Sequence, residues 1–234
     1  SPPSRVSDLH FNVRGPVVAQ LEHIFLGDWN FCTGEAEVPI LSHRHDLGSA
    51  PGDTICRVVD SGPNKRFANI ATLFTAATSL AQRRITIVTP YFLPTRGMIE
   101  VLRIAALRGV AIDIILPARS NLRFVDWATR KMLDEILEFG ATVWYQPPPF
   151  AHAKLFLVDE GYALIGSANM DPRSLRLNFE LDLEIYGHEP VAALIRHAAS
   201  LRQGAREVTL AEVKARRVPE RLRDGVAWLF SPYL

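Results

Sequence analysis

The stretch AKLFLVDEGYALI, residues 153–165, decides the fold of this chain. Two apolar runs, 153–158 and 162–165, flank the polar turn Asp159-Glu160-Gly161. Short apolar runs bounded by a glycine-containing turn are typical of strands that are covered on both faces, and so short a connection joins antiparallel neighbours. The stretch therefore predicts a hairpin at the centre of a sheet.

Outward from this hairpin, strands and helices alternate along the chain. The predicted strands lie at residues 55–59, 85–89, 110–116, 142–146 and 179–186. One predicted helix ends near residue 83, and three more span residues 95–108, 125–139 and 190–203. Such alternation is typical of an α/β layer structure. We expect a mixed, mostly parallel sheet flanked by helices on both faces.

The composition is that of a globular protein with little net charge. The 234 residues include 26 Lys and Arg against 25 Asp and Glu, for a formal net charge of +1. Binding to nucleic acid by bulk charge needs a basic excess, so no nucleic-acid partner is expected. Two cysteines, Cys32 and Cys56, are too few for a disulfide-stapled scaffold. No apolar run is long enough to predict a membrane-spanning helix.

Polar residues gather at the ends of the two hairpin strands. His152 and Lys154 project from the same face at the start of the first strand, while Gly166 ends the second strand and Ser167 and Asn169 follow it. These ends lie side by side in a hairpin, so imidazole, ammonium, hydroxyl and amide groups converge. Imidazole can attack phosphorus or move a proton, and the other groups can hold non-bridging oxygens. The set predicts chemistry on an anionic phosphodiester.

The spacing His152-x-Lys154-x4-Asp159-x6-Gly166-Ser167-x-Asn169 resembles the HKD motif of the phospholipase D superfamily, without gap or substitution. Further stretches resemble the C-terminal half of bacterial cardiolipin synthases over essentially the whole chain. These stretches are residues 15–18, 28–35, 89–94, 105–110 and 169–180. The resemblance implies a phospholipase D-like lobe that acts on phospholipid.

The resemblance also implies a mechanism. Members of the superfamily bring two HKD motifs to one active site, where one histidine forms a covalent phosphohistidine and the other serves as acid and then base. Cardiolipin synthases transfer a phosphatidyl group from one phosphatidylglycerol to a second and release glycerol, with no metal and no cofactor. The family pattern gives His152 the acid–base role and places Glu180 where a carboxylate orients the histidine ring.

Asp159 and Tyr91 can each be interpreted in two ways. Asp159 belongs to the motif and is a catalytic candidate, although its place one hairpin turn away from His152 favours a structural role. Tyr91 is a candidate for lining a lipid entrance, against the alternative that an aromatic ring at a strand end belongs to the core.

The chain holds one HKD motif where the synthases hold two, because no other histidine has a lysine two residues further on. The chain also contains a short internal sequence repeat, which we call the echo. Five residues recur at a single offset of 174 positions: Asp8, Leu9, Pro16, Val17 and Ala19 match Asp182, Leu183, Pro190, Val191 and Ala193. The match fits either chance or a duplicated strand–turn–helix unit.

The duplication hypothesis divides the chain into four parts. Residues 1–30 are the tail of an absent N-terminal lobe, residues 31–54 a connecting loop, residues 55–210 the C-terminal lobe with its one HKD motif, and residues 211–234 a basic and aromatic segment. The partner that completes the site is then the missing N-terminal lobe or a second copy of the chain. We expect the chain alone to be inactive, or active only as a dimer.

The 31–54 loop and the C-terminal segment each leave a choice. A zinc site could be imagined from His43 and His45 with Asp46, Cys32 and Cys56, but their spacing matches no common zinc pattern, so we expect solvated loop residues and no metal. Residues 211–234 fit a membrane-surface anchor or, equally, a terminal helix docked on the domain with its arginines in water. We expect a place at the bacterial cell membrane, peripheral or tethered by an upstream segment.

Two alternatives to the phosphatidyltransferase remain. One is a phospholipase D-like phosphodiesterase or nuclease acting as a homodimer. The other is a non-catalytic half-lobe that binds lipid.

Overall fold

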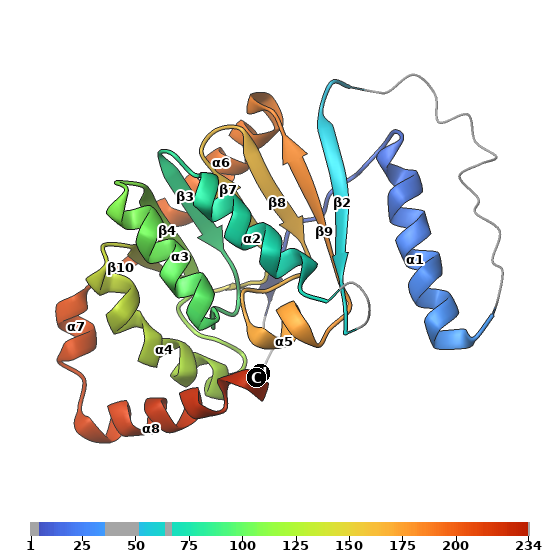
Figure 1. The fold of residues 1–234 in the computed structure, drawn as a ribbon. Coiled ribbons are helices and arrows are strands. Elements are labelled where there is room, and N and C mark those ends of the chain that lie inside the picture. Colours follow the sequence, from blue (N-terminus) through green and yellow to red (C-terminus); the bar gives the residue numbers. More distant parts are fainter. Residues whose placement is uncertain (1–4, 36–51, 64–66, 234) are drawn as a thin grey trace.

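One large sheet organises the molecule. The computed structural model describes residues 5–35, 52–63 and 67–233 (Figure 1). Eight strands pair in a single sheet, which in spatial order comprises β10 (Arg206–Val208), β5 (Thr142–Gln146), β4 (Ala111–Pro117), β3 (Arg84–Val88), β7 (Leu155–Val158), β8 (Tyr162–Gly166), β9 (Glu180–Tyr186) and β2 (Ile55–Ser61). The hairpin of β7 and β8 lies at the centre, as the sequence predicts.

The sheet is mixed but its pairings are mostly antiparallel, which corrects the expected balance. Only β3–β4 and β4–β5 are parallel. Parallel neighbours need a crossover, and helices supply it between these strands. After β5 the chain returns through β7, β8 and β9 without a long crossover helix, so each pairs antiparallel with its neighbour. At the two margins β10 and β2 also pair antiparallel.

Helices cover both faces of the sheet, as expected. On one face lie α2 (Asn69–Leu80), α3 (Arg96–Leu107) and α4 (Arg123–Glu138), and on the other lies α6 (His188–Gln203) (Figure 1). The amphipathic α4 shows why: its buried residues recur at helical spacing as Val125, Ala128, Thr129, Met132, Leu133 and Ile136. Each face therefore has its own apolar core, and the sheet separates the two.

The N-terminal segment begins beside residues 150–151, with which its strand pairs, and its helix packs at the β2 end of the sheet. It comprises the short strand β1 (Val6–Ser7) and α1 (Val17–Thr33), which ends at Gly34 in the left-handed conformation with φ 72°. The helix therefore includes residues 31–33, which the sequence assigned to a loop. Leu9, Val13 and Val17 pack against the α6-side core. Only Ile24 of α1 is fully buried.

The C-terminal segment packs at the other end of the sheet. It forms α7 (Leu210–Lys214), α8 (Val218–Leu229) and a short 3-10 helix, η2 (Ser231–Tyr233). In Figure 1, α8 runs outside α4 along the lower margin, and η2 contacts α5 (Pro172–Arg176).

Several chain turns meet along the side of the sheet where the central strands begin or end, which is the lower side in Figure 1. The end of β3, the start of β7 and the end of β8 are paired there, Val88 with Leu155 and Leu155 with Ile165. A bridge between Phe92 and Met170 joins the segment after β3 to the segment after β8, and Leu93 N donates to Met170 O at 2.7 Å. We call this the active edge, because the predicted site residues other than Asp159 lie along it.

Candidate active site

The imidazole of His152 is held by the N-terminal segment of the chain. Asp8 Oδ2 lies 3.0 Å from His152 Nδ1, and His152 N donates to Ser7 O at 2.8 Å. The strand β6 (Phe150–Ala151), just before His152, pairs in parallel with β1. Burial raises the pKa of the Asp8 carboxyl, but the hydrogen bonds from His152 and from Leu9 N outweigh it and leave the pKa below its usual value. An ionised Asp8 favours a proton on Nδ1, which leaves Nε2 for chemistry.

Lys154 lies directly against this imidazole. Its Nζ is 3.1 Å from each ring nitrogen of His152 and donates to His152 O at 2.8 Å. Burial lowers the pKa of Lys154, while four surrounding carboxylates oppose that shift. These carboxylates belong to Asp8, Glu180, Asp182 and Asp171. The ammonium and imidazole groups thus converge as the sequence predicts, inside a shell of acidic residues.

Asn169 and Ser167 follow β8 at the same edge, but each is engaged differently. Asn169 Nδ2 donates to Ser174 Oγ at 3.1 Å, and its Oδ1 is buried without a hydrogen-bond partner among the described residues. Ser167 Oγ makes a short hydrogen bond to Glu180 Oε2 and accepts from Leu181 N at 3.0 Å. Ser167 therefore ties β8 to β9, while Asn169 keeps unused hydrogen-bonding capacity.

Gly166 has a packing role that the sequence analysis did not predict, in addition to its place at the predicted site. A Cβ at this position would lie 2.6 Å from Asp182 Cα, and closer still to the Asp182 carboxyl and the Leu181 carbonyl oxygen. Two of these three atoms are backbone atoms of β9, which cannot move without opening the sheet. Glycine is required here because β9 approaches so closely.

Asp182 is a buried carboxyl behind the site that the sequence analysis did not select as a site residue. Asp182 is 2% exposed. Its Oδ1 accepts a hydrogen bond at 3.1 Å from the backbone N of Ala168, the residue between Ser167 and Asn169. Burial raises its pKa to about 7. Asp171, the N-cap of α5, accepts from Ser174 N at 2.8 Å, and burial raises its pKa to about 6. Both carboxyls hold the turn that carries Asn169.

The hydrogen bonds of Glu180 within the described residues go to other groups than the His152 ring, whose orientation the sequence analysis assigned to it. The Glu180 carboxylate accepts from Ser167 Oγ and, at 3.0 Å, from Asn178 Nδ2. The carboxylate beside His152 is that of Asp8, which comes from a segment 144 residues away along the chain. The echo in the sequence contained Asp8, but nothing in its pattern indicated that this segment returns to the motif.

Asp159 lies at the far end of β7, away from the active edge. Its carboxylate accepts from three successive backbone N–H groups, Gln82 N at 2.9 Å, Arg83 N at 2.7 Å and Arg84 N at 2.9 Å. Burial raises the pKa of Asp159, but these hydrogen bonds bring it below its usual value. The motif aspartate therefore anchors the start of β3, and the structural interpretation fits its position better than the catalytic one.

Tyr91 lies at the active edge, separated from the site by one ring. Its hydroxyl donates to Asn121 Oδ1 at 2.8 Å, and its ring centroid is 6.4 Å from that of Phe150, which is 6.1 Å from the ring of His152. On the other side of Lys154, a cleft of about 160 Å³ is lined by Asp8, Lys154 and Gly166 and by an apolar wall. The wall residues are Leu9, Phe11, Val13, Leu21, Ala153, Leu155, Ile165, Leu181 and Leu183.

The described residues contain neither a cluster of metal ligands nor a membrane-spanning helix. Among residues 5–35, 52–63 and 67–233, no three His, Cys, Asp or Glu side chains are placed to hold a metal ion. The set His43, His45 and Asp46 lies outside the described residues. Within the same part of the chain, no helix has the length and apolar character to cross a bilayer.

The comparisons of the sequence with known proteins agree on one family. Residues 75–202 match the family described as cardiolipin synthase, PLD-like domain. The cardiolipin synthase of Alkalihalophilus pseudofirmus is 34% identical over 227 residues, which cover 97% of this chain and 45% of that protein. The chain thus spans about half the length of the curated relatives it matches.

Solved structures resemble the fold. Phosphatidylserine synthase of Haemophilus influenzae superposes with a TM-score of 0.61 at 19% identity, covering 81% of this chain and 50% of that one. Nuc of Salmonella typhimurium, a phospholipase D family member, superposes with a TM-score of 0.57 at 19% identity, covering 67% of this chain and 99% of that one.

Proposed function

Because the chain belongs to the phospholipase D-like cardiolipin synthase family, we propose that it supplies one half of the active site of a phosphatidyltransferase. The substrate is phosphatidylglycerol, and the reaction joins two molecules into cardiolipin with release of glycerol. The observation that carries the proposal is the cluster of His152, Lys154 and Asp8, with Asn169 beside it at the same edge. The apolar wall of the neighbouring cleft suits a phosphate that bears a diacylglycerol.

The reaction takes two displacements at phosphorus. In the first, the partner histidine attacks the phosphate, a P–N bond forms, and the P–O bond to glycerol breaks. His152 protonates the departing glycerol oxygen. In the second, His152 takes the proton from a hydroxyl of another phosphatidylglycerol, whose oxygen attacks phosphorus and breaks the P–N bond. Asp8 on Nδ1 stabilises the imidazolium form of His152, which exists before the first displacement and again after the second, and Lys154 holds a non-bridging oxygen.

Asn169 is suited to hold a second phosphate oxygen. Its Oδ1 is buried without a partner among the described residues, and its Nδ2 faces the Ser174 hydroxyl. A hydroxyl can donate as well as accept, so rotation of the amide lets Oδ1 accept from Ser174 while Nδ2 faces the phosphate. We propose this arrangement for the substrate complex. Ser167 contributes indirectly through its hydrogen bond to Glu180.

Asp8 and Glu180 suggest how the second half of the site is arranged. Each stands seven residues before a glycine with positive φ that precedes a helix, Gly15 with φ 97° and Gly187 with φ 120°. This alignment pairs Asp8 with Glu180, and so differs by two residues from the echo, which pairs Asp8 with Asp182. Asp8 reaches the histidine of a motif that follows it by 144 residues. By the same geometry, Glu180 is placed to orient the histidine of the other motif, which its own lobe does not supply.

An N-terminal lobe is the proposed source of that motif. The relatives are about twice as long as this chain, and α1 leaves Phe25, Trp29 and Phe31 exposed while burying only Ile24. Aromatic residues exposed along one helix mark a surface that packs against another unit. Residues 1–30 then belong to the first lobe, 31–54 connect the lobes, and 55–210 form the second. A lipid substrate places the enzyme at the bacterial cell membrane, either peripheral or tethered upstream.

The test uses the full-length protein with radiolabelled phosphatidylglycerol in mixed micelles. His152→Ala abolishes cardiolipin formation, while His188→Ala, at an exposed position in α6, leaves it unchanged. Samples denatured in detergent at alkaline pH, where a phosphohistidine survives, distinguish the two histidines: if His152 is the acid–base group, the His152→Ala protein still carries label on the partner histidine. Cardiolipin formation by His152→Ala at the wild-type rate overturns the proposal. A protein that nicks plasmid DNA and forms no cardiolipin is the nuclease instead.

A further inference from the structure

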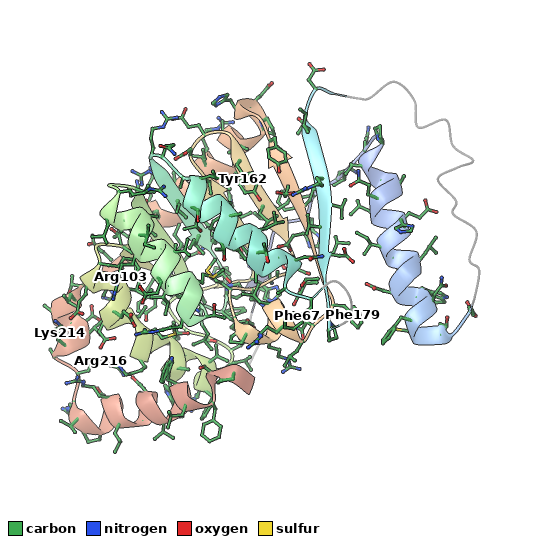
Figure 2. The ribbon with its side chains drawn as sticks, viewed as in Figure 1. Phe67, Arg103, Tyr162, Phe179, Lys214 and Arg216 are labelled. Carbon is green, nitrogen blue, oxygen red and sulfur yellow. The ribbon has the colours of Figure 1, made fainter. Side chains whose placement is uncertain are left out.

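The inner face of α8 packs against the domain, and its charged groups are paired within the protein. Asp224 and Ala227 are buried against the body of the domain, with exposed fractions of 1% and 0%. Arg216 forms a short ion pair with Asp224, and Arg223 lies 2.8 Å from the same carboxylate and 4.5 Å from the centroid of the Trp127 ring. Lys214, labelled in Figure 2 with Arg216, pairs with Glu138 at 2.7 Å. These basic residues are therefore not available to a partner.

The outer face of α8 is apolar and uncovered. Its residues recur at positions i, i+4, i+8 and i+11, and their exposed fractions are 76% for Val218, 68% for Leu222, 47% for Val226 and 66% for Leu229. Phe230 follows them, 52% exposed, with its ring centroid 5.9 Å from that of Phe124. Single exposed apolar residues are ordinary, but a continuous row along one helix marks an interaction surface. We call these five residues, 218, 222, 226, 229 and 230, the α8 stripe.

Free cations accompany the α8 stripe. Arg217 and Arg221 are exposed, and neither forms an ion pair with a residue in the described part of the chain. Trp228 follows Arg221 by seven residues, which places it on the same side of the helix, and it is 38% exposed. An apolar face flanked by arginine and tryptophan is the composition of helices that lie in the interface of an anionic bilayer.

The α8 stripe is placed where a bilayer could meet the active edge. The helix runs along the lower margin of the domain in Figure 1, and η2 at its end contacts α5, which carries the turn of Asn169. It lies outside α4 at the β5 end of the sheet, whereas α1 lies at the β2 end. The N-terminal lobe is therefore expected on the far side of the sheet from α8, which leaves the α8 stripe free.

We propose that the α8 stripe docks on the surface of an anionic phospholipid bilayer and turns the active edge toward the lipid. The proposal rests on the proposed function, because docking brings the active edge to a substrate only if that substrate is a lipid. The observations that support the docking itself are those on α8. Val218, Leu222, Val226 and Leu229 enter the region between headgroups and acyl chains, while Arg217 and Arg221 meet lipid phosphates. Phe230 anchors the end of α8 nearest the site, so that a phosphatidylglycerol headgroup has a short path to His152.

The experiment measures flotation of the chain of residues 1–234 with two kinds of vesicle, pure phosphatidylcholine and equal parts phosphatidylcholine and phosphatidylglycerol. Replacing Val218, Leu222, Val226 and Leu229 with Ser weakens partitioning onto the mixed vesicles by roughly a hundredfold, since four aliphatic side chains no longer enter the interface. Arg217→Gln with Arg221→Gln weakens it by roughly thirtyfold on the mixed vesicles, and has no effect on pure phosphatidylcholine.

Matched controls come from the opposite edge. Leu80 and Leu107, at the ends of α2 and α3, are 73% and 79% exposed, and replacing both with Ser leaves flotation unchanged. Circular dichroism confirms that each variant is folded. Equal flotation of the stripe variant and the wild type overturns the proposal, as does a wild-type dimer that the stripe variant converts to monomer without lipid, since the face then joins two copies. Flotation does not depend on turnover, so loss of the proposed function leaves this result interpretable.

Discussion

The close approach of β9 to Gly166 predicts what one added methyl group does. In Gly166→Ala the new Cβ lies 2.6 Å from Asp182 Cα and closer still to the Leu181 carbonyl oxygen and the Asp182 carboxyl. The side chain of Asp182 can turn away, but the backbone atoms move only if β8 and β9 separate. Overpacking of this kind costs about 3 kcal/mol of unfolding free energy. A chain of this length loses about 2–4 °C per kcal/mol, so the Tm falls by roughly 6–12 °C.

The assay is thermal unfolding followed by circular dichroism, with Gly161→Ala as the matched control. Gly161 lies in the turn of the same hairpin, and a Cβ there meets no atom within 4 Å. We expect its Tm to stay within about 2 °C of the wild type, because surface substitutions away from special features are nearly neutral. Adding Asp182→Ala to Gly166→Ala restores only part of the loss, since the Leu181 carbonyl remains. A Gly166→Ala protein as stable as Gly161→Ala refutes the packing role and leaves Gly166 only its place at the predicted site.

Three further predictions concern the acidic residues of the motif and its surroundings. In the full-length enzyme, Asp8→Ala lowers kcat roughly a hundredfold or more with little change in Tm, because the imidazole loses its orienting carboxylate; a kcat within twofold of wild type contradicts this. Asp182, with its pKa raised to about 7, binds a proton in the folded state that the unfolded chain releases, so stability falls as pH rises from about 4 to 7. Urea unfolding of Asp182→Asn shows a flatter pH dependence in that window, and an unchanged slope argues against the assignment. Asp159→Ala removes the acceptor of three backbone N–H groups and lowers stability by about 2 kcal/mol, while kcat of the folded full-length enzyme stays at the wild-type level; a large loss of kcat at unchanged stability makes Asp159 catalytic after all.

Local patterns were sufficient for most elements and for the meeting of His152 and Lys154. The central hairpin, the helices α3, α4 and α6 and the strand β5 all follow from apolar periodicity and from glycines or prolines at their ends. Strand direction was predicted less well, because the alternation rule assumes a crossover after every strand. The chain reverses at Asp159-Glu160-Gly161 and again after α5, and each reversal gives an antiparallel pair.

The acidic partners of the site could not be predicted from the motif. Asp8 contacts His152 because β1 pairs with β6, a contact between strands of two residues each that carry no periodicity. Asp182 lies behind the site because β9 packs tightly against Gly166, and the sequence shows only an alternating acidic strand, Glu180, Asp182 and Glu184. On such a strand, pattern alone cannot distinguish a carboxylate that faces solvent from one that is buried.

The charges around Lys154 support the proposal that a second motif completes the site. Four carboxylates act on this ammonium, and only one imidazole accompanies it. Burial raises the pKa of Asp171 and of Asp182, to about 6 and about 7, so part of that negative charge is neutralised by protons at neutral pH. A phosphodiester adds a further negative charge to a site where, among the described residues, Lys154 already lies near four carboxyl groups. The lysine and histidine of a second motif would supply the missing positive charge. Electrostatic balance thus calls for a second half-site as much as the need for two histidines does, and a half-site alone should bind the phosphate weakly even where its geometry is complete.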